Sequence, residues 1–116
     1  MNAGIGLIVY PVKDLAAAKS VFTTLLGVEP YVDQPYYVGY RVGDTEVGLD
    51  PNAHRQGVTV PIGYREVTDI EESLKALETA GATVRQSPRD VGGGLLVATV
   101  TDADGNILGL RQPPQQ

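Results

Sequence analysis

The stretch that decides the fold is Leu7-Ile8-Val9-Tyr10-Pro11-Val12-Lys13-Asp14-Leu15, an apolar run that ends in Val-x-Asp-Leu. Its β-branched and aliphatic residues predict a strand, and the aspartate predicts the N-cap of a helix that follows directly. The same plan returns 55 positions later, where Val67 and Asp69 take the places of Val12 and Asp14. We therefore expect two copies of one small structural unit.

Each copy is predicted to be a βαβββ unit, so the fold class is α+β. Alternating apolar residues, helix caps and turn residues place the elements. The first copy should contain a strand at 5–12, a helix at 15–26, a short extended segment at 29–34 and strands at 36–42 and 45–50. The second should contain strands at 58–67, 83–86, 95–101 and 107–111 and a helix at 70–80. The chain is then a single domain, with module one at 4–50, a linker at 51–57, module two at 58–111 and a tail at 112–116.

Composition excludes several classes of function. The 116 residues carry a net charge of −5, which argues against a nucleic-acid surface because phosphate binding needs a basic patch. Without cysteine the chain can form neither a disulfide nor a thiolate metal site nor a thiol nucleophile. No basic signal region or membrane-length apolar run is visible, so we expect a soluble, cytoplasmic protein that does not bind membranes.

The repeat and the turn Asp102-Ala103-Asp104-Gly105-Asn106 resemble the vicinal oxygen chelate family. This superfamily includes glyoxalases, extradiol dioxygenases, fosfomycin-resistance enzymes and bleomycin-resistance proteins. The resemblance covers nearly the whole chain. It implies two βαβββ modules that form a curved mixed sheet around a cleft, with the helices outside. Such a cleft can lie within one chain or be shared in a dimer.

The resemblance also locates the family's four metal-ligand positions, which here hold Leu7, Gly48, Ile62 and Gly109. None of these side chains can bind a divalent metal, because carboxylate, imidazole or thiolate donors are required. A metal site of the family type is therefore expected to be lost, with no cofactor in its place. The chain is closest in character to the metal-free, bleomycin-resistance-like members. These proteins sequester a small molecule as homodimers.

Strand alternation indicates which other side chains should share the cleft with those four positions. Tyrosines, two glycines and an aliphatic floor would suit a flat or aromatic small molecule. The predicted ligand-binding residues are Leu7, Val9, Tyr37, Tyr40, Gly48, Asp50, His54, Ile62, Tyr64, Glu66, Gly109 and Arg111. The tyrosines could instead complete the core or a dimer interface.

Two alternatives to simple binding stay open. Glu66 is the candidate acid–base residue of a metal-independent, isomerase- or lyase-like enzyme, since an apolar pocket favours a protonated carboxyl. The other alternative is a non-catalytic subunit whose cleft is filled by its own side chains. His54 lies in a polar linker, and no Ser-His-Asp or Cys-His arrangement is evident.

Overall fold

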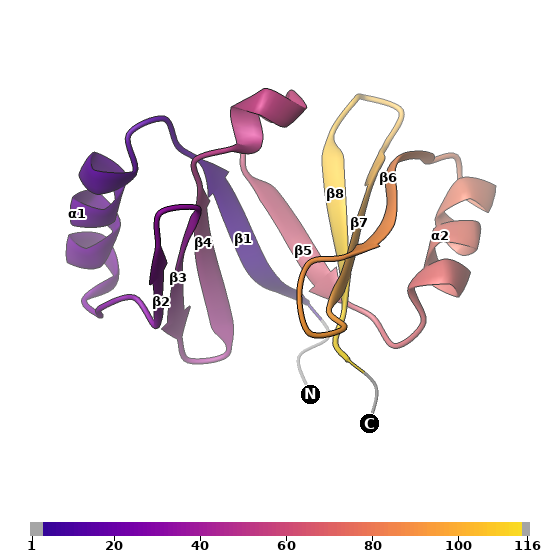
Figure 1. Cartoon of the computed structure of the whole chain (residues 1–116). Coiled ribbons are helices and arrows are strands. Elements are labelled where there is room, and N and C mark those ends of the chain that lie inside the picture. Colours follow the sequence, from indigo (N-terminus) through magenta and orange to yellow (C-terminus); the bar gives the residue numbers. More distant parts are fainter. Residues whose placement is uncertain (1–3, 115–116) are drawn as a thin grey trace. The chain divides into compact units, whose positions relative to one another are not determined.

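The computed structural model describes residues 4–114 of the chain. These residues form two compact units, one of residues 4–63 and one that begins at Tyr64. Each unit follows the βαβββ plan, so the predicted fold class is confirmed (Figure 1). No helix among residues 4–114 is long and apolar enough to cross a membrane.

The first unit packs one helix against one face of a four-stranded sheet (Figure 1). The strand order is β2-β3-β4-β1, with β1 parallel to β4 and the other neighbours antiparallel. Its elements are β1 (Ile5–Pro11), α1 (Leu15–Leu26), β2 (Val32–Gln34), β3 (Tyr37–Val42), β4 (Thr45–Asp50) and the 3-10 helix η1 (Ala53–Gln56).

Helix α1 begins and ends where the local sequence dictates. The Asp14 carboxylate accepts a hydrogen bond from the Ala17 N–H at 3.0 Å, which satisfies a donor that the first turn leaves unpaired. Gly27 ends the helix in the left-handed conformation with φ 72°, which a glycine adopts without steric cost. Between these ends, the helix covers a core built on Val38, Tyr40, Val47 and Leu49.

The second unit repeats the arrangement with the strand order β5-β8-β7-β6. Strands β5 and β8 are parallel, and the other neighbouring pairs are antiparallel. Helix α2 packs on a core of Ile70, Leu74, Ala98, Val100 and Leu110. The elements are β5 (Ile62–Glu66), α2 (Ile70–Thr79), β6 (Thr83–Asp90), β7 (Leu96–Thr101) and β8 (Ile107–Gln112).

The N-terminus of α2 has two acceptors rather than one. The Asp69 carboxylate accepts from the Glu72 N–H at 3.1 Å, as the repeated junction predicts. The side-chain carbonyl of Gln112 accepts from the Ile70 N–H at 2.8 Å. Gln112 is therefore the last residue of β8 and a cap of α2, and the predicted tail at 112–116 begins one residue too early. Its last two residues lie outside the described part of the chain.

Two strand boundaries differ from the prediction by four residues, and both differences have local causes. The strand expected at 58–67 starts only at Ile62, because Val58 instead donates its N–H to the Ala53 carbonyl beside η1. Strand β6 runs to Asp90 rather than Gln86, with register shifts that accommodate its extra length.

Candidate functional site: two tyrosine-covered glycines

Each sheet has one face covered by its helix and one face turned away from it, which we call the helix-free face. Residues paired across neighbouring strands point to the same face. In the first unit, Val9 pairs with Gly48 and Leu7 with Glu46, while Gly39 pairs with Gly48 from the other side. The core residues Val38, Tyr40, Val47 and Leu49 alternate with these positions and point to α1. The predicted site residues Leu7, Val9, Tyr37 and Gly48 therefore share the helix-free face.

Gly48 has no space for a side chain, because the Tyr37 ring lies over it. A Cβ atom at Gly48 would be 2.0 Å from the Tyr37 hydroxyl oxygen and 2.6 Å from ring atom Cζ. The backbone of Gly48 is not in the left-handed region, so glycine is needed here for space and not for conformation. A Cβ atom at Gly39 would be 3.2 Å from the ring of Tyr37 and 3.4 Å from the ring of Tyr31.

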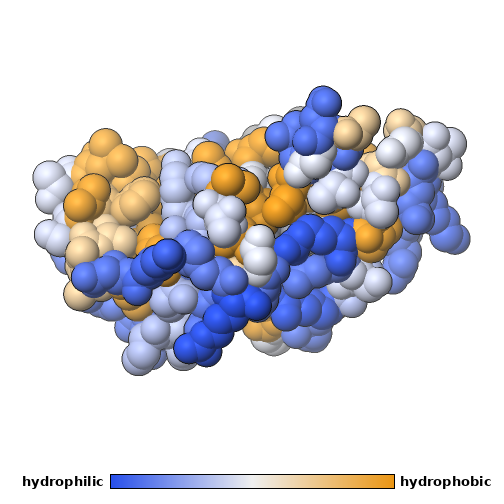
Figure 2. Space-filling view, turned by 90° about the horizontal axis from the view of Figure 1, so that it is seen from above, coloured by the Kyte–Doolittle hydropathy of each residue, from blue (hydrophilic) through white to orange (hydrophobic). Residues whose placement is uncertain are grey.

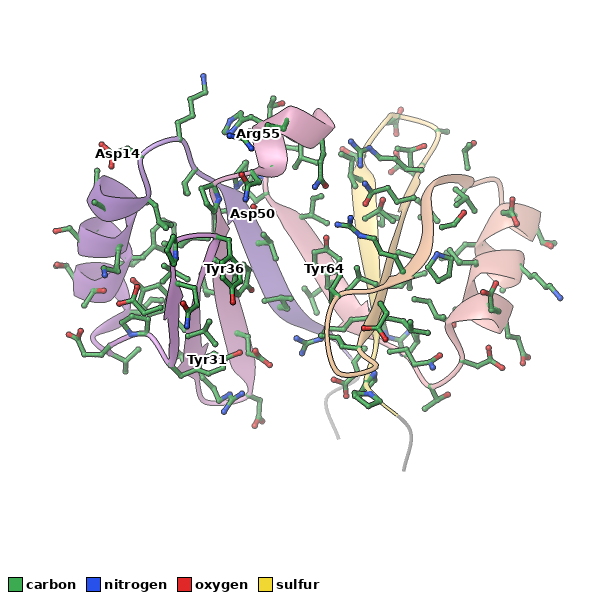
Figure 3. The ribbon with its side chains drawn as sticks, viewed as in Figure 1. Asp14, Tyr31, Tyr36, Asp50, Arg55 and Tyr64 are labelled. Carbon is green, nitrogen blue, oxygen red and sulfur yellow. The ribbon has the colours of Figure 1, made fainter. Side chains whose placement is uncertain are left out.

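Tyr31, which is labelled in Figure 3, contacts two charged side chains beside this aromatic surface. Its hydroxyl donates a hydrogen bond to the Glu46 carboxylate, and the Arg41 guanidinium carbon lies 4.1 Å from the centre of its ring. Partial burial, followed by the hydrogen bond to Glu46, raises the pKa of the Tyr31 hydroxyl. The phenol therefore stays neutral and keeps its proton as a donor throughout the physiological range.

The second unit has the same feature, built from a different strand. Tyr64 of β5 pairs with Gly109 of β8, and a Cβ atom at Gly109 would be 2.4 to 2.7 Å from ring atoms Cδ2, Cε2 and Cγ of Tyr64. Figure 3 shows Tyr64 on β5. Gly109 also pairs with Thr99 of β7, so Tyr64 and Thr99 belong to the same helix-free face. Glycine is again required because a tyrosine ring occupies the space where a side chain would lie.

The next residue pair on this face of β5 and β8 is charged. Glu66 pairs with Arg111, and the Arg111 Nη2 atom lies 3.7 Å from Glu66 Oε1. The Arg111 side chain is only 15% exposed, whereas that of Glu66 is 55% exposed. The apolar enclosure that an acid–base role for Glu66 requires is therefore missing, and the carboxylate points largely to solvent.

The helix-free faces do not fit a metal centre of the family type. The four positions that the resemblance assigns to metal ligands hold Leu7, Gly48, Ile62 and Gly109, and tyrosine rings fill the space beside both glycines. Within residues 4–114, no three His, Cys, Asp or Glu side chains are grouped so that they could hold a metal ion. Three or four such donors are the usual minimum for a bound transition metal.

Two of the predicted site residues, Tyr40 and His54, lie apart from the tyrosine-covered glycines, whereas a third, Asp50, shares the strand face of Gly48 but stabilises a turn. Tyr40 is fully buried on the helix side of β3, where its hydroxyl contacts the Thr23 hydroxyl at 2.8 Å, so it belongs to the core. Its position three residues after Tyr37 reverses its direction on a strand. Asp50 accepts a hydrogen bond from the Asn52 N–H and stabilises the turn into η1. His54 lies on η1, where its buried Nδ1 atom has no hydrogen-bond partner.

Three further residues of the helix-free faces were not predicted: Tyr31, Gly39 and Thr99. Alternation in Leu96–Thr101 separates Leu96, Ala98 and Val100 from Thr99, which would have placed the threonine on the same face as Gly109. Tyr31 lies outside any strand, so no periodic pattern could have located it.

The sequence of the chain matches the model of the Glyoxalase/Bleomycin resistance protein/Dioxygenase superfamily over residues 4–110. The chain belongs to this superfamily, which confirms the resemblance that the repeated junction indicates. No curated protein sequence matches the chain.

Solved structures with the same fold have diverse described activities. The structure described as an NAD-dependent benzaldehyde dehydrogenase from Legionella pneumophila has a TM-score of 0.75 at 16% identity, over 91% of this chain and 96% of that one. Methylmalonyl-CoA epimerase from Mycobacterium tuberculosis has a TM-score of 0.70 at 16% identity, with coverages of 97% and 89%. A superfamily member from Vibrio splendidus has a TM-score of 0.69 at 16% identity, with coverages of 91% and 95%. At these identities the likeness shows the fold alone.

Proposed function

We propose that this chain is a small-molecule binding protein that holds its ligand without a metal ion and without transforming it. The observation that carries the proposal is the replacement of two ligand positions by glycines whose space is taken by the rings of Tyr37 and Tyr64. Aromatic rings with a polar handle offer a flat apolar surface and a hydrogen-bonding group. The ligand class that fits such a surface is a planar or aromatic small molecule.

Proton transfer by Glu66 has less support. More than half of its side chain is exposed, and its ion-pair partner Arg111 lies beyond direct hydrogen-bond distance at 3.7 Å. A general base needs a carboxylate held in a defined position beside the reacting proton. The ligand-sequestering role requires no such group. A cleft shared in a dimer and a cytoplasmic location stay predictions.

A thermal-shift screen of planar aromatic compounds in the presence of EDTA tests the proposal, since a ligand that binds only the folded state raises its stability by mass action. We expect Tyr64→Ala to weaken binding of hit compounds in the second unit, and Tyr37→Ala binding of those in the first unit, by about tenfold, or about 1.4 kcal/mol. Tyr36→Ala is the matched control, because Tyr36 lies at the β2–β3 turn and is 64% exposed (Figure 3).

Three outcomes would contradict this function. Stoichiometric zinc, nickel or iron in the native protein, or loss of binding on chelation, would show that a metal site exists. Turnover of a bound compound that disappears in Glu66→Gln would favour the enzyme. If no planar compound shifts the melting temperature, the better interpretation is a non-catalytic subunit whose tyrosines fill its own cleft.

We propose in addition that the protein is a homodimer, and the outer face of α1 supports this. That face consists of Ala16, Ala17, Ser20, Val21, Thr24 and Leu25, which are exposed and uncharged. Val21 and Leu25 are 63% and 72% exposed. Figure 2 shows apolar atoms gathered over α1 at the left of the view. A neutral face can meet its own copy without the like-charge repulsion that an acidic chain would otherwise impose.

Light scattering of the wild type and of Leu25→Glu tests the dimer. We expect the wild type to have twice the mass of the chain and Leu25→Glu to have the mass of one chain. Thr79→Glu on the exposed face of α2, which already carries Glu71, Glu72, Lys75 and Glu78, is the control and should stay dimeric. A monomeric wild type, or a Leu25→Glu dimer, would rule out this interface.

A further inference from the structure

Thr99 is the polar group of the second unit that the fold leaves unexplained. Its side chain is 2% exposed, and the Oγ1 atom is buried without a hydrogen-bond partner. Leaving a buried hydroxyl unpaired costs about 1–3 kcal/mol, so buried hydroxyls in native proteins are almost always paired. A threonine of this kind on a helix-free face calls for a partner that binds there.

The surroundings of Thr99 indicate how a partner would reach it. Thr99 pairs with Gly109 across β7 and β8, so its neighbour on that strand contributes no side chain. The ring of Tyr64 occupies the space above Gly109. Directly opposed residues of antiparallel strands have Cβ positions about 4.5–5.5 Å apart, which brings the hydroxyl close to the ring. A rotation of Tyr64 would therefore open the hydroxyl to a ligand.

Arg111 supplies a positive charge on the same face, two residues after Gly109 on β8. Four residues pair in a row across the strands of this sheet: Arg89 of β6, Val97 of β7, Arg111 of β8 and Glu66 of β5. These four residues include two arginines and one carboxylate, and the side chain of Arg111 is only 15% exposed. A shielded guanidinium binds a carboxylate strongly because it can donate two parallel hydrogen bonds.

We propose that the ligand of this protein is an aromatic carboxylic acid bound on the helix-free face of the second unit. Its ring stacks on Tyr64, its carboxylate pairs with Arg111 in place of the long contact to Glu66, and the Thr99 hydroxyl donates to a ligand oxygen. This inference rests on the proposed binding function and names the chemical class that the site takes. Glu66 then acts as a competitor for Arg111 that the ligand displaces.

The test compares 1-naphthoate with 1-naphthamide, which share a ring system and differ in charge. Isothermal titration of the wild type should give about tenfold tighter binding for the acid than for the amide, the effect of one charge-assisted hydrogen-bond pair. Arg111→Gln should remove this preference and leave amide binding unchanged. Glu66→Gln should tighten acid binding several-fold, because the competing carboxylate is gone. A purely structural role for Glu66 would not have that effect.

Matched variants isolate the hydroxyl and the charge. Thr99→Val should weaken acid binding about three- to tenfold without lowering the melting temperature, because it removes an unpaired buried hydroxyl while keeping the shape. Thr101→Val, one step along the same strand and face, should leave binding unchanged. Arg65→Gln makes the same charge change on the opposite face of β5 and should also leave binding unchanged.

The outcomes separate this inference from the proposed function. Equal binding of acid and amide by the wild type, or wild-type acid binding by both Arg111→Gln and Thr99→Val, overturns the carboxylate site but leaves metal-independent binding intact. Absence of binding by both compounds overturns the carboxylate site together with aromatic binding on this face.

Discussion

At the scale of single residues, Gly109 and Tyr64 form a pair in which neither residue can be changed alone without consequence. A methyl group at Gly109 would lie 2.7 Å from Cγ of Tyr64, which is close to the backbone and cannot move without turning the whole side chain. We expect Gly109→Ala to lower the free energy of unfolding by about 1–3 kcal/mol, the usual cost of overpacking. Urea unfolding measures this change.

Gly48→Ala is the comparison, and it should cost less. The closest approach there involves the Tyr37 hydroxyl, at the far end of its side chain. The double variant Tyr64→Ala with Gly109→Ala should lose less stability than the two single effects combined, because the clash is absent once the ring is removed. Additive effects in this double-mutant cycle would show that the ring and the glycine are independent.

Asp102 accepts the hydrogen bonds that close the turn between β7 and β8. The hydrogen bond from the Asn106 side chain, assisted by backbone N–H donors, holds the pKa of Asp102 below its ordinary value of 3.8. A lowered pKa in the folded state stabilises the protein above the ordinary pKa, and this stabilisation is lost as pH falls through the folded value. We expect Asp102→Asn to destabilise the protein at pH 7 and to unfold like the wild type near pH 2.

Urea unfolding at a series of pH values measures this difference. The control is Asp104→Asn, since the hydrogen bonds of this turn go to the Asp102 carboxylate. If Asp102→Asn lowers the free energy of unfolding by the same amount from pH 7 to pH 2, the stabilisation does not come from the charged Asp102 carboxylate.

At the scale of secondary-structure elements, the two helices should depend differently on their N-caps. Asp14→Ala removes the side-chain acceptor at the start of α1, whereas Asp69→Ala leaves the Gln112 carbonyl bound to the Ile70 N–H of α2. We expect a loss of about 1 kcal/mol for Asp14→Ala, a smaller loss for Asp69→Ala, and a further loss when Gln112→Ala is combined with Asp69→Ala. Chemical denaturation of the three single variants and the double variant gives these values. If Gln112→Ala leaves the free energy of unfolding unchanged, this contact does not stabilise α2.

Prediction from the sequence works best at this scale. The helix at 15–26 agrees with α1, because an N-cap aspartate and a C-terminal glycine mark its two ends. The strand predicted at 58–67 begins late because the Val58 N–H pairs with the Ala53 carbonyl beside η1, a local contact that the apolar pattern of the segment does not indicate. For the candidate site, alternation places Gly48 and Gly109 on helix-free faces, but it cannot show that Tyr37 and Tyr64 cover them. Ring direction depends on packing between strands. Tyr40 differs, because its position three residues after Tyr37 already places it on the helix-covered face of β3.

At the scale of the whole molecule, the substitution of all four ligand positions predicts indifference to metal ions. Dialysis against EDTA should leave the melting temperature unchanged, and added Zn²⁺ or Ni²⁺ should not raise it, since an ion can stabilise the folded state only by binding to it. Differential scanning calorimetry before and after dialysis measures this. A melting temperature that falls with EDTA and recovers with one equivalent of metal would contradict the prediction.

The tyrosine-covered glycines also bear on how this chain can change over evolutionary time. A glutamate at position 48 or 109 and the present ring positions of Tyr37 or Tyr64 exclude each other, because both need the same volume. A single mutation that introduces a carboxylate would first clash with a tyrosine, and loss of the tyrosine alone would leave a void. A change to a metal-dependent protein therefore requires paired changes in each half of the chain, and no single mutation in either half is enough.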